Sequence, residues 1–234
     1  MWSPWHMVLL LWLFANVAFN VDGRCVFTGH CGNDEDTDKP IPCSVYSNPT
    51  PTLDDSVWQT FEQVCPQLAS ETSHDHKVCC DSNQIRDMAR ELEQPAKLGM
   101  AKCPGCMLNF KDLLCRMTCS PQQSEFIFVN ATQRGVTGLH VSELVYALSR
   151  DFAHGVYDTC KDVRSVLGVK LMTLMCNGRF SGCSPQYWLD FLGSTPKEGG
   201  YAPFHIHHLI TDAPLVQLHG AILKPLRVPH FPAC

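Results

Sequence analysis

Fourteen cysteines constrain this chain more than any other feature. The 234-residue sequence has an even number of cysteines, and they run from Cys25 to Cys234. An apolar run from Met7 to Phe19, followed by small and polar residues, predicts a secretory signal peptide over residues 1–23. The run is too short to span a bilayer comfortably, which argues against an N-terminal anchor. Disulfides persist in the oxidising compartments that secretion reaches, so we expect seven of them in a mature domain of residues 24–234.

Length and charge restrict the class of protein. Removal of 23 residues would leave 211, enough to bury a sizeable core, so the disulfides supplement a core rather than replace it. The net charge is −5, and no acidic or basic block is long enough to suggest a nucleic-acid partner. No second apolar run approaches twenty residues, so we expect no membrane-spanning helix in residues 24–234. Eleven histidines would bring the charge from −5 to +6 if all were protonated.

Apolar spacing predicts several helices. Residues three and four positions apart lie on one face of a helix, and three segments place their apolar side chains at this spacing. The three segments are residues 54–68, 81–95 and 142–160, and the apolar stripe is clearest in the last. Pro66 limits the first helix, and Pro95 stands beyond the end of the second. We expect a shorter helix at 166–176 and another after Ser184, with Pro185 in the first turn, where proline is tolerated.

Strand signals are fewer. Residues 125–129 and 202–210 are dense in β-branched and aromatic residues, and 213–218 is a possible partner strand. Residues 25–54 are rich in Cys, Pro, Asp and Asn and have little periodicity, which predicts loops held by disulfides. The sequence therefore predicts an α+β fold, a mainly helical, disulfide-rich domain with a small β-sheet.

The segment "CPGCMLNFKDLLCRMTC", residues 103–119, suits three different chemistries. A Cys-Pro-Gly-Cys at a helix start is typical of a redox centre, but that site needs a preceding strand, and "ELEQPAKLGMAK" indicates a helix end and a loop. Four thiolates could bind zinc, although structural zinc sites mostly occur where thiols stay reduced. Disulfide formation is favoured, because Cys106 and Cys115 lie on different helix faces and should reach other segments rather than each other.

Other polar residues give weaker signals. The pattern "NAT" makes Asn130 a candidate for N-glycosylation. His205 and His207 would share one strand face, which could bind a metal but is more often a solvated surface, so no metal or other cofactor is expected. The serines lack a nucleophile-elbow motif, and nothing assembles a hydrolytic site.

Six motifs follow one another along the chain: "CVFTGHCG", "VCPQL", "VCCDSNQI", "CPGCMLNFKDLLCRMTCSPQQSEF", "YDTCKDV" and "APFHI". In this order they resemble the N-terminal luminal domain of the Niemann-Pick type C membrane sterol transporters and of their intestinal cholesterol-uptake relative. The resemblance covers nearly all of residues 24–234. It is most specific from Cys103 to Phe126, and loose at 131–140 and 161–175.

The resemblance implies a fold and a disulfide pattern. That family domain is a mainly helical, disulfide-bonded module with a small sheet, and it binds one cholesterol or oxysterol in a deep pocket. Carried over cysteine by cysteine, its pattern implies these pairs: Cys25–Cys79, Cys31–Cys43, Cys65–Cys115, Cys80–Cys119, Cys103–Cys234, Cys106–Cys160 and Cys176–Cys183.

The resemblance also implies a polar end of the pocket. Gln84 matches a family glutamine that meets the sterol hydroxyl, although Asp81 and Gln84 also have the spacing of a capping box that needs no ligand. Pro42 stands where the family transporter has an asparagine that contacts the hydroxyl. His30 replaces an acidic residue, and Phe27 replaces a tryptophan. We expect these departures to alter affinity or preference among sterols.

The apolar wall follows by the same correspondence, and its alternative is ordinary core packing. The implied wall residues are Met88, Met107, Leu114, Leu144 and Tyr146. The positions around the pocket mouth are Trp188, Pro203, Phe204, Ile206 and, as a surface for sterol transfer, Leu174 and Met175.

The resemblance implies sterol transport rather than catalysis. The chain would accept cholesterol or oxysterol from the small soluble Niemann-Pick type C carrier protein and pass it toward a membrane. The compartment would be the secretory pathway, the lumen of lysosomes or endosomes, or the extracellular space. Family proteins continue into a linker and membrane segments beyond the position matched by Cys234. The alternatives are a secreted disulfide-rich interaction domain that binds no sterol, and thiol oxidoreduction by Cys103 and Cys106.

Overall fold

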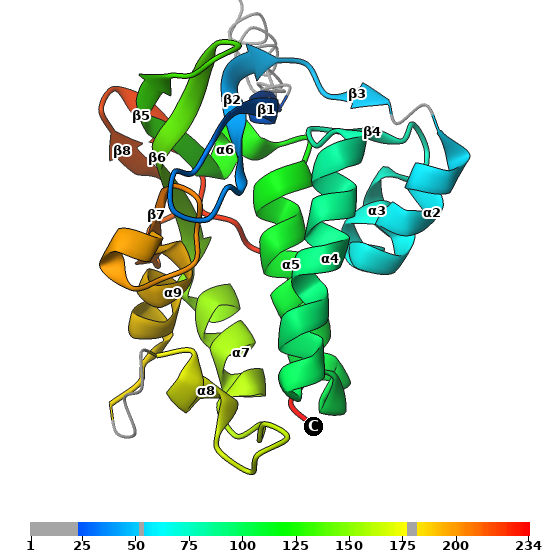
Figure 1. Cartoon of the computed structure of the whole chain (residues 1–234), viewed down its shortest axis with the longest axis vertical. Coiled ribbons are helices and arrows are strands. Elements are labelled where there is room, and N and C mark those ends of the chain that lie inside the picture. The colour runs from blue at the N-terminus through cyan, green and yellow to red at the C-terminus, as the bar shows by residue number, and fades with distance from the viewer. Residues whose placement is uncertain (1–22, 52–53, 177–181) are drawn as a thin grey trace, which may run out of the picture.

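The structure is a computed structural model, and it describes residues 23–51, 54–176 and 182–234 (Figure 1). All but the last residue of the predicted signal peptide lie outside the described residues. A group of helices, α2 to α5, lies on one side of the molecule, and a β-sheet lies on the other, with α7 and α9 beside the sheet (Figure 1). The predicted fold class, α+β with many disulfides and a small sheet, is confirmed.

The main sheet consists of β1 (Cys25–Asn33), β2 (Pro40–Ser47), β6 (Leu139–Ser149), β5 (Ile127–Arg134) and β7 (His205–Thr211). Its order is β1-β2-β6-β5, and these neighbours are antiparallel. The last strand, β7, pairs with β6 in parallel. Two short antiparallel pairs complete the strands: β3 (Thr50–Pro51) with β4 (Lys77–Val78), and β8 (Val216–Leu218) with β9 (Ala221–Leu223).

The described helices are α2 (Asp55–Val64), α3 (Pro66–Thr72), α4 (Ser82–Leu98), α5 (Pro104–Cys119), α6 (Gln123–Phe126), α7 (Arg150–Cys160), α8 (Leu171–Leu174) and α9 (Pro185–Gly193). Two 3₁₀ turns are η1 (Met100–Lys102) and η2 (Pro196–Glu198). Where a helix begins depends on its N-cap residue, because a side-chain oxygen there can accept a hydrogen bond from a free backbone N–H of the first turn. Asp54 caps α2, and Ser184 caps α9 with Pro185 in its first turn, as predicted. No described helix is long and apolar enough to cross a bilayer.

The prediction of loops at 25–54 is wrong, because β1 and β2 occupy most of this segment. Their pairing is interrupted by register shifts between Cys25 and Phe27 and between Thr28 and Gly32. A register shift breaks the alternation of inward and outward side chains, so the usual period of two was not visible in the sequence.

The prediction of a helix from residue 142 is also wrong in its first half. Residues Leu139–Ser149 form β6, which pairs with β2, β5 and β7, and the helix α7 starts only at Arg150. Only the first residue of β6, Leu139, is exposed, and the last six, residues 144–149, are buried. A strand buried on both faces reads as a continuous apolar run, which resembles a buried helix.

Smaller differences concern element ends. The predicted strand at 125–129 begins only at Ile127, after the short helix α6. The predicted helix at 166–176 is reduced to Leu171–Leu174. The segment 213–218 contributes β8, which pairs with β9 and not with β7. Pro95 lies inside α4, which ends at Leu98 before Gly99, whose positive φ of 127° stops the helix.

All fourteen cysteines lie among the described residues, and all are paired. The pairs are the seven that the resemblance implies: Cys25–Cys79, Cys31–Cys43, Cys65–Cys115, Cys80–Cys119, Cys103–Cys234, Cys106–Cys160 and Cys176–Cys183. The three cysteines of α5 and Cys103, its N-cap residue, therefore form disulfides with four distant segments of the chain. None of them offers the free thiolate that a zinc site or a reduced redox centre would need.

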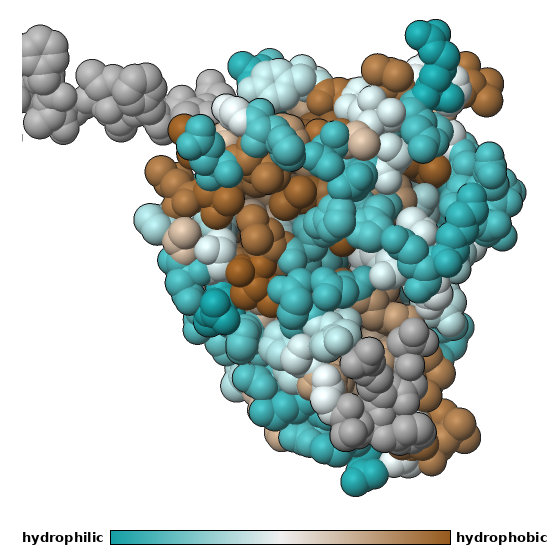
Figure 2. Space-filling model, turned by 90° about the vertical axis from the view of Figure 1, so that its left-hand side faces the viewer, coloured by the Kyte–Doolittle hydropathy of each residue, from teal (hydrophilic) through white to brown (hydrophobic). Residues whose placement is uncertain are grey.

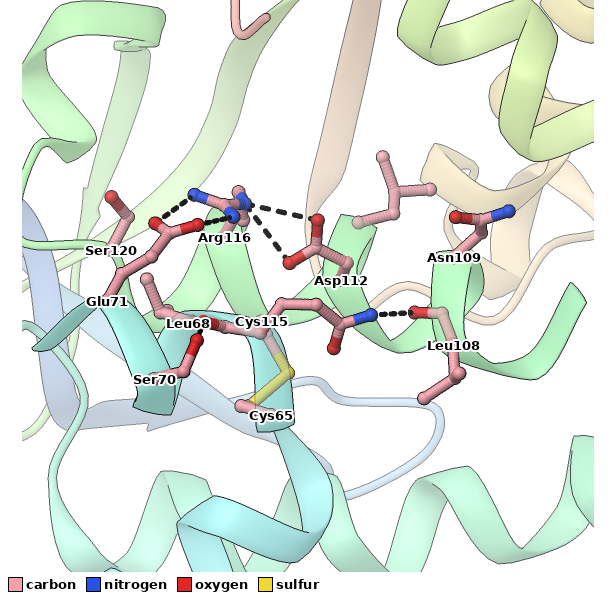
Figure 3. Close-up of polar contacts among 12 residues, drawn as sticks. Cys65, Leu68, Ser70, Glu71, Leu108, Asn109, Asp112, Cys115, Arg116 and Ser120 are labelled. Atoms are coloured by element: carbon pink, nitrogen blue, oxygen red, sulfur yellow. Dashed lines mark hydrogen bonds and ion pairs between the residues drawn. A yellow bond between two sulfur atoms is a disulfide. The ribbon is translucent and has the colours of Figure 1, made fainter. Parts of the chain in front are cut away.

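A buried charge network joins α3 to α5 beside the Cys65–Cys115 disulfide (Figure 3). Arg116 donates from Nη1 and Nη2 to the Glu71 carboxylate at 2.8 and 2.6 Å, and from Nε to Asp112 at 3.1 and 3.2 Å. The side chains of Arg116 and Asp112 are 7% and 3% exposed. Burial raises the pKa of Asp112, although the charge of Arg116 opposes that rise. The network fixes the second half of α5, which also lines the cavity described below.

Candidate functional site

A cavity of about 430 Å³ lies between the first turns of α4, the strands β1 and β2, the second half of α5 and the start of β7. Part of its lining is apolar: Phe27, Pro42, Met88, Leu114, Met117, Pro203, Phe204 and Ile206. Phe27 and Phe204 meet edge to face, with ring centroids 6.4 Å apart. Such an arrangement suits a ligand that is mostly apolar, because binding then removes apolar surface from water on both sides.

Gln84 supplies a polar group to this cavity. Its Oε1 accepts hydrogen bonds from the backbone N–H groups of Asp81 at 3.0 Å and Gly29 at 2.9 Å. Asp81 in turn accepts from the N–H of Gln84 at 2.8 Å, so the capping box is present. Within the described part of the chain, Gln84 Nε2 donates to no acceptor, which leaves a donor available beside the cavity.

The backbone of β1 helps to place that glutamine. Gly29 has a φ of 64°, which glycine adopts without strain, and its N–H points at Gln84 Oε1. The hydroxyl of Thr28 is a weaker donor to the same oxygen, at 3.5 Å. Two elements that are distant in sequence, β1 and α4, thus meet at one amide group.

Charged residues surround the opening of the cavity. Lys39 Nζ lies 3.1 Å from Glu91 Oε1 on α4, and it also donates to the backbone oxygen of Tyr201 at 3.1 Å. Lys39, the residue before β2, therefore links α4 to the segment before β7. Further polar residues that line the cavity are Asn33, Asp38, Asp81, Asn83, Arg86, Asp87, Arg90 and Thr118. Sequence reasoning missed this rim, and it also missed Met117, whose apolar side chain lies one helical turn after Leu114.

The two departures from the family pattern lie at the cavity. Pro42 is buried in β2, where it offers neither a side-chain polar group nor an amide hydrogen. His30 is exposed, and its Nε2 is hydrogen-bonded to Asn33 Oδ1. Phe27, in contrast, is 2% exposed and belongs to the core as well as to the cavity wall.

Several residues that the resemblance assigned to the pocket do not line this cavity. Leu144, Tyr146 and Trp188 are completely buried in the core, and Met107 packs against that core. Tyr146 donates its hydroxyl to the backbone oxygen of Leu113 at 3.1 Å, and burial raises its pKa far above the usual value. The ring of Trp188 packs against other aromatic rings with centroids 6.2 Å away. All four residues thus make core contacts in this structure, and their assignment to a sterol pocket stays a prediction.

The two residues assigned to sterol transfer lie elsewhere. Leu174 ends α8 and is 44% exposed, and Met175 follows it and is half-buried. Figure 1 places α8 near the lower end of the molecule, whereas α4 begins near the upper end, after β4. Neither Leu174 nor Met175 lines the 430 Å³ cavity.

Two of the three histidines of β7, His205 and His207, form hydrogen bonds with glutamates. His205 and His207 share one face of the strand, with ring centroids 4.2 Å apart. His205 Nδ1 is 2.9 Å from Glu198 Oε2, and His207 Nε2 is 2.8 Å from Glu143 Oε1. Asn130 is exposed and donates to the same Glu143 oxygen at 2.7 Å. Among the described residues no cluster of three or more side chains could hold a metal ion.

The comparisons with known proteins agree on one family. The model of the family described as Niemann-Pick C1 N terminus matches residues 22–224. The chain is 32% identical over 197 residues to NPC intracellular cholesterol transporter 1 of Sus scrofa, an alignment that covers 81% of this chain and 15% of that protein. It is 28% identical over 239 residues to NPC1-like intracellular cholesterol transporter 1 of Homo sapiens, covering 96% of this chain and 17% of that protein.

This chain thus spans about a sixth of the length of the curated relatives that it matches. The family match nevertheless covers most of the described residues, including β1, α4, α5 and β7, which line the cavity. The chain belongs to the Niemann-Pick C1 N terminus family.

Proposed function

We propose that this chain binds one cholesterol or oxysterol in the 430 Å³ cavity, with the sterol hydroxyl against Gln84. A sterol is a rigid apolar plate with one hydroxyl, so it needs an apolar wall and one or two polar groups that fix its orientation. The observation that carries the proposal is the free Nε2 of Gln84 beside an apolar lining. The volume also falls within the usual range for small-molecule pockets, about 300–1,000 Å³.

The family supports a role in sterol transport. The relatives carry names that describe intracellular cholesterol transporters. In the proposed role the chain accepts sterol from the small soluble Niemann-Pick type C carrier and passes it toward a membrane, without making or breaking a covalent bond. Leu174 and Met175 would contact the carrier. The seven disulfides suit the lumen of the secretory pathway, of endosomes or lysosomes, or the extracellular space. In longer relatives other segments would supply the membrane anchor.

The test is equilibrium binding of radiolabelled cholesterol to wild-type protein and to Gln84→Glu. Glutamate keeps the oxygen that accepts from Asp81 and Gly29, so the capping box is retained, but it lacks the Nε2 donor. We expect the wild type to bind saturably with one sterol per chain. We expect Gln84→Glu to bind at least tenfold more weakly, because a donor is lost and a carboxylate is buried against the hydroxyl.

Gln94→Glu is the matched control, since Gln94 is an exposed residue of the same helix and undergoes the same change in charge. We expect it to bind like the wild type. Equal affinities for all three proteins would show that the hydroxyl does not meet Gln84. Absence of saturable binding by a cooperatively melting wild type would instead favour the disulfide-rich interaction domain that binds no sterol.

A further inference from the structure

The loop between α7 and α8 exposes aliphatic side chains at its tip. Leu167 is 84% exposed, Val166 61% and Val169 36%. Leu98, at the end of α4, is 38% exposed and lies beside them, because the Val166 N–H donates to the Leu98 backbone oxygen at 3.0 Å. Single exposed aliphatic residues are common on proteins, but a group of four at one end of a molecule needs an explanation.

The tip has a defined shape. Ser165 N donates to Val169 O at 2.8 Å, and Gly168 N donates to Ser165 O at 3.0 Å, so residues 164–170 form a short hairpin. Gly168 has a φ of 81°, and Arg164 Nη1 closes the turn by donating to the Gly168 oxygen at 2.7 Å. The aliphatic side chains are therefore held outward before any partner arrives, which reduces the entropic cost of contact.

Cations surround these side chains. The two segments that meet at the tip, 97–102 and 161–170, carry five cationic residues and one carboxylate, Asp162. The cationic residues are Lys97, Lys102, Lys161, Arg164 and Lys170. Lys97, Lys161 and Lys170 have ion pairs with Glu93, Asp158 and Asp162. Within the described residues Lys102 has no carboxylate partner, and Arg164 is committed only to a backbone oxygen.

We propose that this tip, residues 164–170 with Leu98, docks on a bilayer that contains anionic phospholipids. The aliphatic residues would enter the boundary between head groups and acyl chains, and the cations would contact phosphate groups. Exposed apolar residues together with cations bind peripheral proteins to anionic membranes. A small number of either kind alone is not sufficient. The contact goes beyond sterol binding, and it does not depend on an occupied cavity.

The position of the tip fits such a contact. Figure 1 shows the loop between α7 and α8 at the lower end of the molecule, on the same side as the end of α4. The face that carries β5, β7 and β8 has a different apolar area in its upper part (Figure 2). Leu215, just before β8, is 58% exposed, and Figure 1 shows β8 in the upper part of the molecule, away from the loop between α7 and α8. That residue provides a matched control.

The experiment measures co-sedimentation of the full chain with two kinds of vesicle, phosphatidylcholine alone and phosphatidylcholine with roughly a third phosphatidylserine. We expect binding to the anionic vesicles that weakens at high salt, and at least tenfold weaker binding to phosphatidylcholine alone. Leu167→Asp should weaken binding to the anionic vesicles about tenfold or more, because an aliphatic side chain is replaced by a charge that anionic lipid repels.

Two further variants separate the contributions. Lys102→Glu should also weaken binding to the anionic vesicles by about tenfold, because it changes the charge near the anionic surface by two units. Leu215→Asp should leave this binding unchanged. All of these positions are exposed, so thermal melts should match the wild type. Equal binding by wild type and Leu167→Asp, or loss of binding in Leu215→Asp instead, would overturn the proposal. So would the absence of vesicle binding by the wild type, the result expected if the tip contacts a protein.

Discussion

The two polar atoms of the Gln84 side chain have different surroundings. Oε1 is fully used by backbone donors from Asp81 and Gly29, whereas Nε2 has no acceptor among the described residues. A helix cap needs only the oxygen, so the cap leaves the nitrogen available for a ligand. Pro42, which also lines the cavity, has neither a polar side chain nor an amide hydrogen. Of these two positions, only Gln84 offers the hydroxyl a side-chain hydrogen-bonding group.

Restoring a polar group at Pro42 should strengthen sterol binding. In Pro42→Asn the new amide could form one more hydrogen bond to the hydroxyl, worth about 1 kcal/mol, or about a fivefold increase in affinity. The measurement is equilibrium binding of cholesterol and of an analogue that lacks the 3-hydroxyl. The gain should be absent for the analogue. An equal gain for both ligands would mean that residue 42 acts through packing.

His208 makes folding stability depend on pH. This residue of β7 is 7% exposed, and burial lowers its pKa from 6.5 to about 3. The unfolded chain takes up a proton near pH 6.5, and the folded protein only near pH 3. Stability is therefore highest above pH 6.5 and decreases as the pH falls toward 3, with a loss of about 2 kcal/mol at pH 5.

The variant His208→Gln isolates this contribution. Glutamine stays neutral, so the difference in unfolding free energy between pH 7 and pH 5 should be about 2 kcal/mol smaller than in the wild type. Denaturant unfolding at the two pH values provides the measurement, and variant and wild type are compared at each pH. The same pH dependence in both proteins would show that His208 is protonated in the folded state.

At the scale of elements, α5 connects most of the molecule. Its three cysteines and the N-cap residue Cys103 form disulfides with the segments that contain Cys65, Cys80, Cys160 and Cys234. Its buried Arg116 joins the exposed Glu71 of α3 to the buried Asp112 (Figure 3). Its outer residues Leu114 and Met117 line the cavity. The position of the cavity wall thus depends on contacts made on the other faces of the same helix.

Single substitutions in the charge network should lower the unfolding free energy by different amounts. Arg116→Met leaves Asp112 buried without a partner, and should reduce the unfolding free energy by about 3–5 kcal/mol. Glu71→Gln should cost at most about 1 kcal/mol, because Glu71 is 53% exposed. The double variant Arg116→Met/Asp112→Leu should recover most of the loss, since it leaves no buried charge.

Denaturant unfolding of these variants at neutral pH, with all disulfides intact, would provide the comparison. A double variant that is no more stable than Arg116→Met would contradict the account, because it would mean that the ion pair itself, and not the unpaired carboxylate, governs stability. A large loss in Glu71→Gln would indicate that the α3 side of the network is buried more deeply than the structure has it.

For the whole molecule, the sequence predicted the α+β class and the regions that form most helices. It did not predict β1 and β2, because their bulges hide the alternation, or β6, because both faces of that strand are buried. Nine of the predicted sterol-site residues line the cavity: Phe27, His30, Pro42, Gln84, Met88, Leu114, Pro203, Phe204 and Ile206. Their role in sterol binding stays a prediction. Leu144, Tyr146 and Trp188 could not be separated from pocket residues, since apolar wall and apolar core have the same composition.

The charged rim could not be predicted for another reason. Lys39, Glu91 and Tyr201 are distant in sequence, and they meet only because β2, α4 and the segment before β7 converge at the opening. Each residue alone is typical of a solvated surface. Long-range convergence of this kind carries no local signal in a single sequence.

Photolabelling tests the central claim, sterol binding in this cavity, most directly. The wild-type protein is irradiated with cholesterol that carries a diazirine on the ring system, and the labelled residues are identified by mass spectrometry. We predict labels at Met88, Leu114 and Phe204, all of which line the cavity, and loss of these labels when unlabelled cholesterol is added. Labels at Leu144, Tyr146 or Trp188, or labels that unlabelled cholesterol does not displace, would contradict the account.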